Sequence, residues 1–169
     1  MRSPLFFFPN EFLFSLPDAG KLRAVILERR KTKDLSRLAL ARFANRAQRA
    51  VRLSGEVNVL LTSDSELRQL NLQFRHKDQT TDVLSFPQDS GGDIAISLQT
   101  ARQQAAALGH DLLTEVKVLI LHGMLHLAGH DHEADRGQML RLERRLRTEL
   151  RLPAGLIERT APAARGRRS

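Results

Sequence analysis

A histidine-rich run, LHGMLHLAGHDHEAD at residues 121–135, limits how this chain can fold more than any other stretch. Four imidazoles fall within eleven residues. The spacing of His122 and His126 places their side chains on one face of a helix, one turn apart. Such a pair is typical of the metal-binding helices of zinc hydrolases, in which a glutamate follows the first histidine as general base. Gly123 stands in that position here, so a metal site would have to work without this carboxylate.

The third ligand has to come from beyond this helical pair. On a continuous helix His130 would lie two turns from His122, a rise of about 12 Å, so the rings would not converge. Gly129 readily adopts the left-handed conformation that ends a helix. The chain can then fold back and bring His132 over the first two histidines. We therefore predict His122, His126 and His132 as ligands, with His130 outside the ligand set, either behind the ligands or in the wall of the site.

Three histidines with an open fourth position are typical of a catalytic zinc site. The chain has no cysteine, which excludes disulfides and thiolate ligands and fits a reducing compartment. One Zn²⁺ per chain is the predicted cofactor, although Ni²⁺ and Cu²⁺ also bind histidine. Asp131 has two interpretations. Its carboxylate either orients the ring of a ligating histidine without binding the metal itself, or caps the helix that follows.

The charge of the chain favours a polyanionic partner. The 169 residues suffice for one domain with its own core, and 27 basic against 19 acidic residues give a net charge of +8. Residues 151–169 alone hold five arginines and one glutamate. RNA is the usual partner of such a protein, but a solvated basic tail without a specific role explains the tail's charge equally well.

The N-terminus is rich in phenylalanine, with five of the eight in residues 1–20. Pro9, Asn10 and Glu11 interrupt this apolar run, and no small-residue cleavage site of a signal peptide follows. No segment approaches the ~20 apolar residues of a membrane span. We expect a cytoplasmic protein without a membrane segment, made of an N-terminal extension (1–20), one domain (21–152) and a basic tail (153–169). No pattern indicates an oligomeric state.

Hydrophobic periodicity predicts an α+β domain. Strands are expected over residues 23–30, 56–62, 82–86 and 92–97. Helices are expected over residues 34–53, capped by Asp34, 64–74, 97–109, 111–128 and about 134–150. Because no strict βαβ unit repeats, we predict a mixed sheet of about four strands, packed with about five helices that include a zincin-like metal helix. Glu143 and Arg147 form an i,i+4 pair, typical of a solvated helix face.

Four motifs together resemble the bacterial YbeY family, the metal-dependent endoribonucleases of ribosomal RNA maturation. The histidine run is similar to the family's signature, and three further stretches agree in order and spacing: NLQFRHKD (71–78), TDVLSFP (81–87) and GDIAIS (92–97). The likeness covers about residues 21–152. His130, Thr80 and Gly91 depart from the tyrosine, proline and leucine that are usual in the family, and none of them is a proposed ligand.

The resemblance implies a single-strand-specific endoribonuclease that acts in 3′-end maturation of the small-subunit (16S) rRNA and in ribosome quality control. Single-stranded RNA and the ribosome would be its partners. It also implies zinc on the three histidines and a catalytic arginine, which here is Arg75. Asp82, Ser85 and Asp93 are candidates to line the cleft, although Asp and Ser at strand ends commonly bond to backbone groups instead.

A nuclease accounts for the glycine at position 123. A phosphodiester is already anionic, and its cleavage concentrates negative charge that a metal ion and a guanidinium stabilise. Two nucleophiles fit these residues: a water activated by the metal, or the 2′-hydroxyl of the RNA. Two other functions compete: a non-catalytic ribosome assembly factor with a structural zinc, and a metallopeptidase, against which Gly123 counts.

Overall fold

The computed structural model describes residues 24–29, 32–132, 134–154 and 159. The predicted N-terminal extension and most of the basic tail lie outside these residues. Nine elements follow in order: β1 (Ala24–Glu28), α1 (Arg37–Val51), β2 (Glu56–Thr62), α2 (Asp64–Arg75), β3 (Val83–Pro87), β4 (Gly91–Ser97), α3 (Leu98–Leu108), α4 (Leu112–Leu127) and α5 (Gln138–Leu150). Among the helices described, none combines the length and the apolar character that crossing a bilayer requires.

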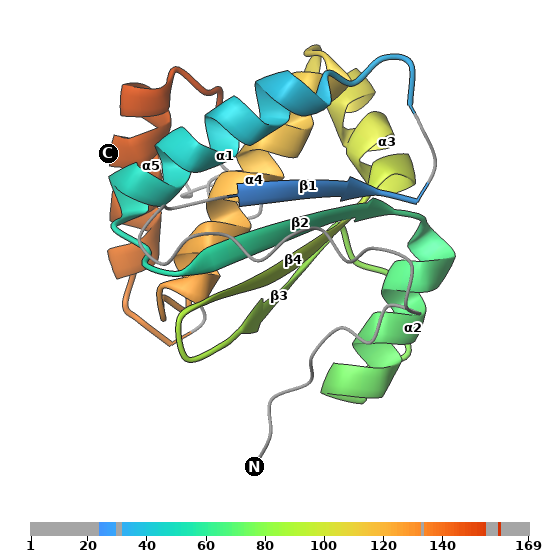
Figure 1. The fold of residues 1–169 in the computed structure, drawn as a ribbon, viewed down its shortest axis with the longest axis horizontal. Helices are drawn as coiled ribbons and strands as arrows, with labels where there is room; N and C mark the ends of the chain where they lie inside the picture. Colours follow the sequence, from blue (N-terminus) through green and yellow to red (C-terminus); the bar gives the residue numbers. More distant parts are fainter. Residues whose placement is uncertain (1–23, 30–31, 133, 155–158, 160–169) are drawn as a thin grey trace, which may run out of the picture.

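The strands form one mixed sheet in the order β1-β2-β4-β3 (Figure 1). β1, β2 and β4 run parallel, and the edge strand β3 runs antiparallel to β4. Parallel neighbours need long crossover connections, and α1 lies in the crossover between β1 and β2. For the described residues, the predicted α+β fold with a four-stranded mixed sheet and five helices is confirmed.

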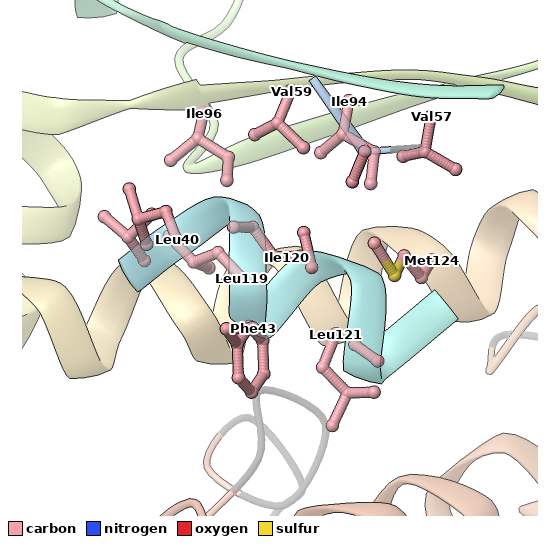
Figure 2. Packing of buried hydrophobic residues seen from close by; sticks show 14 of the residues in the cluster. Leu40, Phe43, Val57, Val59, Ile94, Ile96, Leu119, Ile120, Leu121 and Met124 are labelled. Atoms are coloured by element: carbon pink, nitrogen blue, oxygen red, sulfur yellow. The ribbon is translucent and has the colours of Figure 1, made fainter. Parts of the chain in front are cut away.

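The main hydrophobic core lies between one face of the sheet and the helices α1 and α4. Val57, Val59, Ile94 and Ile96 point from β2 and β4 toward these helices (Figure 2). α4 is buried on nearly all sides because the sheet, α1, α3 and α5 all contact it, which explains its high apolar content. This buried helix carries the histidine pair and holds it on a rigid support.

α2 covers part of the opposite face of the sheet, over a smaller apolar cluster formed by Leu60, Leu67, Leu84 and Ala95. The rings of Phe74 in α2 and Phe86 in β3 meet edge to face, with centroids 5.3 Å apart. These contacts place the C-terminal end of α2 against the edge strand β3. They thereby bring Arg75, the last residue of α2, to the border of the sheet.

The first helix starts later than predicted. Ser36 is its N-cap, because the Ser36 hydroxyl accepts a hydrogen bond from the backbone N–H of Ala39. Asp34, the predicted cap, forms an exposed ion pair with Arg102 of α3 instead.

The last helix also starts later, at Gln138 rather than near Ala134. The carboxylate of Asp135 accepts hydrogen bonds from the backbone N–H groups of residues 137–139. Asp135 therefore caps the start of α5. This capping role was one of the two roles that the sequence suggested for Asp131. Asp131 closes the preceding turn through its backbone carbonyl.

Candidate active site: a three-histidine metal centre

The helix α4, which carries His122 and His126, ends in a turn that depends on Gly129. Gly129 has a φ of 88°, its N–H bonds to the carbonyl of His126, and the N–H of His130 bonds to the carbonyl of Leu125. These two bonds form a Schellman motif. A Cβ at Gly129 would meet no atom within 4 Å. The reason for glycine at this position is therefore the left-handed backbone conformation and not a lack of space for a side chain. The bend predicted at Gly129 is confirmed.

Beyond this turn the chain returns over α4 and brings His132 to His122 and His126. The centroid of the His132 ring lies 5.6 Å from that of His122 and 5.4 Å from that of His126. One ligand nitrogen from each residue lies within 4.8 Å of the others. The structure thus brings together the three histidines predicted as ligands, and His130 is not part of the group.

The three imidazoles fit a transition-metal ion. Two nitrogens that each bind one zinc ion at ~2.1 Å lie at most ~4.2 Å apart. The Nε2 atoms of His122 and His126, which are 3.1 Å apart, satisfy this limit. A set of imidazole nitrogens suits Zn²⁺, Ni²⁺ or Cu²⁺ better than the oxygen-preferring Mg²⁺ or Ca²⁺.

Glu143 orients the first of these rings. Its Oε1 lies 3.0 Å from the Nδ1 of His122, and both side chains are buried, with 1% and 5% exposed. Because a carboxylate accepts hydrogen bonds, Nδ1 carries the proton, and the lone pair of Nε2 is left for a metal. Glu143 therefore does not lie on the solvated face that its spacing with Arg147 predicted.

The sequence contained a signal for this role. The buried residues of α5 are Met139, Glu143, Leu146 and Leu150, which follow one another at helical spacing. A carboxylate in such an apolar stripe is costly unless it is paired. Its position therefore indicates a buried hydrogen-bond donor on a neighbouring element.

The environment of the site keeps His126 in the neutral form that binds metals. Burial lowers the pKa of His126 to about 4, and the charges of His122, His132 and Arg75 add to this effect. The charge of Asp131 acts in the opposite direction, so this carboxylate is within electrostatic range of the cluster. That position supports the interpretation of Asp131 as a residue that acts on the ligands.

Arg75 approaches the histidines from the other side of the sheet. Its side chain is exposed, and its Nη2 donates a hydrogen bond of 3.2 Å to the backbone carbonyl of Ser85 in β3. The Ser85 hydroxyl donates to the carbonyl of Gly123 in α4, also at 3.2 Å. Ser85 therefore connects Arg75 to the metal helix, and the effect of Arg75 on the pKa of His126 shows that its charge reaches the site.

Gly123 lets α4 approach the sheet closely. A Cβ at this position would lie 2.9 Å from the Cγ2 of Ile94 and 3.1 Å from the Oγ of Ser85. Position 123 thus faces the sheet, and a glutamate there would have no room. The packing of α4 explains the glycine and leaves no place for the general base of a His-Glu-x-x-His metallopeptidase.

The other two strand candidates make different contacts. The carboxylate of Asp82 accepts hydrogen bonds from the backbone at the start of β3 and from Gln104 of α3. Asp93 accepts from Asn58 and Gln88, and burial raises the pKa of its carboxyl group. Because side chains alternate along β4, Asp93 lies on the sheet face opposite α4. The structure therefore does not place Asp82 or Asp93 in contact with the histidines.

The family model and the curated relatives that match the sequence point to one family. The family model described as Endoribonuclease YbeY matches residues 22–151. The chain is 51% identical over 144 residues to Endoribonuclease YbeY of Koribacter versatilis (strain Ellin345), covering 83% of this chain and 95% of that protein. It is 53% identical over 133 residues to Endoribonuclease YbeY of Solibacter usitatus (strain Ellin6076), covering 78% and 90%. The solution structure of a Thermotoga maritima protein is similar, with a TM-score of 0.53 and 29% identity over 75% of this chain and 88% of that chain.

Proposed function

The chain belongs to the YbeY endoribonuclease family, and on this basis we propose that it is a zinc-dependent endoribonuclease specific for single-stranded RNA. Its proposed role is 3′-end maturation of the small-subunit (16S) rRNA and ribosome quality control in the cytoplasm, with the ribosome as partner. The observation that carries the proposal is the three-histidine group with the charge of Arg75 beside it.

Each residue of the site has a role in this reaction. His122, His126 and His132 would hold the ion, and Glu143 keeps the Nε2 of His122 directed toward it. When bound, Zn²⁺ supplies a Lewis acid that stabilises negative charge on phosphoryl oxygens and acidifies water. The guanidinium of Arg75 is planar and permanently charged, so it suits an RNA phosphate and the charge that develops there during cleavage.

The number of ligands favours catalysis over a purely structural zinc. A structural zinc site is normally closed by four protein ligands, whereas a catalytic site keeps one position open. In the part of the chain that the structure describes, the group contains three ligand residues. The exposed guanidinium of Arg75, whose charge reaches the three histidines, can stabilise negative charge on a phosphate during cleavage. A non-catalytic assembly factor would not require this stabilisation.

The proposal is tested by cleavage of labelled single-stranded RNA with zinc-loaded protein. We expect His126→Ala to lose both zinc and activity. We expect Arg75→Glu to keep zinc but to lose activity by about 10²–10³-fold, as for removal of one charge-stabilising donor. Arg145→Glu, which reverses an exposed arginine of α5, is the matched control and should cleave like the wild type.

Zinc removal and readdition should abolish and restore the activity. Cleavage that persists equally in His126→Ala and Arg75→Glu would come from a contaminating nuclease and would contradict the proposal. Wild-type cleavage by a zinc-loaded Arg75→Glu protein would exclude a catalytic role for Arg75.

A further inference from the structure

A basic pocket lies toward the end of α4 that is remote from the histidines. It has a volume of about 250 Å³ and opens where the N-terminal half of α4 meets α1 and the residues that follow α5. Four cationic residues line it, together with an apolar part that includes Phe43 and Leu150: Arg42, Arg46, Lys117 and Arg151. Among the described residues that line the pocket, none is acidic.

Among the described residues, no carboxylate pairs with the arginines of this pocket. Within the described ranges, the side chains of Arg42, Arg46 and Arg151 form no hydrogen bond or ion pair. Lys117 lies over the ring of Phe43, 5.9 Å from its centroid. Asp111 is within electrostatic range of Lys117, but its carboxylate already caps α4 through the N–H of Thr114.

The helix α1 concentrates positive charge on this side of the molecule. Its sequence, RLALARFANRAQRAV, contains no acidic residue. Arg42, Arg46 and Arg49 are exposed and follow one another at i, i+4 and i+7, so they share one face of the helix. Like charges at this spacing repel one another, and an anion bound between them would relieve that repulsion.

We propose that this pocket binds a phosphodiester segment of single-stranded RNA, and so holds the substrate strand at a second point away from the metal centre. The inference rests on the proposed function for the identity of the polyanion. Lys117 and His126 are nine residues apart in α4, which is a rise of about 13.5 Å and about half a turn around the helix axis. An RNA strand that contacts both sites must therefore pass around the surface of the domain, over a path longer than this rise.

The size of the pocket and the exposure of its cations favour a segment of a chain over a free small molecule. Small-molecule sites typically enclose ~300–1,000 Å³, and this pocket is smaller. Its three arginines are exposed, as expected for contacts with a phosphate backbone. Phe43 is only 5% exposed, so its ring is not available for stacking with a base. The binding should therefore be sensitive to salt and tolerant of RNA sequence.

Two matched charge reversals test the inference. Arg42→Glu/Arg46→Glu reverses two exposed pocket arginines, and Arg141→Glu/Arg145→Glu reverses two exposed arginines at the same spacing in α5. Full-length, zinc-loaded proteins are titrated with a fluorescent oligouridine that has 2′-O-methyl riboses and phosphorothioate linkages, which resist cleavage. Fluorescence anisotropy gives the dissociation constant over a salt series. Arg42→Gln/Arg46→Gln is measured alongside, and circular dichroism checks the fold of each variant.

We expect Arg42→Glu/Arg46→Glu to weaken RNA binding about tenfold at low salt. The plot of the logarithm of the association constant against the logarithm of the salt concentration should become less steep by about 1.4, because two contacts with phosphates of a single strand are lost. The neutral pocket variant should change binding in the same direction, and the α5 reversal should change it little. Equal losses in both reversals, or no loss in either, would overturn the inference. This RNA resists cleavage, so its binding is measured independently of nuclease activity. If the protein binds it through the pocket but cleaves no natural RNA, the proposed nuclease function is refuted and the pocket inference stands.

Discussion

At the scale of single residues, the His122 imidazole has two partners, one for each ring nitrogen. Its Nδ1 faces the carboxylate of Glu143, and its Nε2 faces His126 and the metal position. Glu143 is 1% exposed, and a buried carboxylate without a partner would be costly. The two side chains therefore depend on each other, and the bond fixes the tautomer that binds a metal.

We expect Glu143→Gln to lower the zinc affinity by about 10–100-fold, as is usual when an outer hydrogen-bond partner of a ligating histidine is lost. Glutamine keeps the volume of the side chain but removes the charge that stabilises the Nδ1 proton. Competition with a chelating indicator measures the affinity. Glu149→Gln, at an exposed position of the same helix, is the control. A Glu143→Gln protein with wild-type affinity would show that Glu143 does not act on the site.

At the scale of elements, local signals predicted the helix α4 at both ends. Asp111 caps its start, and Gly129 ends it in the left-handed conformation, as their positions in the sequence indicated. The start of α5 was predicted too early because Arg136 and Gly137 both take positive φ, and hydrophobic periodicity does not reveal such a turn. Strands were predicted from alternation, but their order in the sheet depends on contacts distant in the sequence.

Gly129→Ala should lower the free energy of unfolding by about 1–2 kcal/mol, since an L-residue is strained in the left-handed region. Gly109→Ala is a matched control, because Gly109 has a φ of 72° and a Cβ there also meets no atom within 4 Å. Both variants should lose similar stability in chemical denaturation. Only Gly129→Ala should weaken zinc binding, because His132 follows this turn. Equal zinc affinities in the two variants would argue against a role for the turn in placing His132.

At the scale of the whole molecule, the site combines residues that the sequence keeps far apart. Spacing within one short run predicted the three histidines, and the family resemblance indicated Arg75. Glu143 was missed because its hydrogen bond crosses from α5 to α4. The tight contact of Gly123 with Ile94 was also beyond local patterns, because it depends on how closely α4 packs on the sheet.

A buried ion pair links Arg159, a residue of the predicted basic tail, to α4. Glu115 of α4 is fully buried, and its Oε1 lies 2.7 Å from the Nη1 of Arg159. Its Oε2 lies 2.5 Å from the Nε2 of His110, at the end of α3. Arg159 therefore stabilises the turn between α3 and α4 and is not a solvated surface charge.

Arg159→Ala should lower the free energy of unfolding by about 3 kcal/mol, because it leaves a buried carboxylate with His110 as its remaining partner. Arg102→Ala is the control, since its ion pair with Asp34 is exposed and such pairs contribute at most about 1 kcal/mol. Urea denaturation of both proteins gives the comparison. Equal destabilisation by the two substitutions would contradict the structural role of Arg159.

The most direct test of the metal centre compares zinc binding by His132→Ala and His130→Ala, two histidines only two residues apart. The wild type and His130→Ala should each bind one zinc ion per chain with similar affinity. His132→Ala should lose more than the ~100-fold that loss of an outer partner costs, because one of three ligands is removed. Zinc affinity that falls as far in His130→Ala as in His132→Ala, or in neither variant, would contradict the three-histidine site.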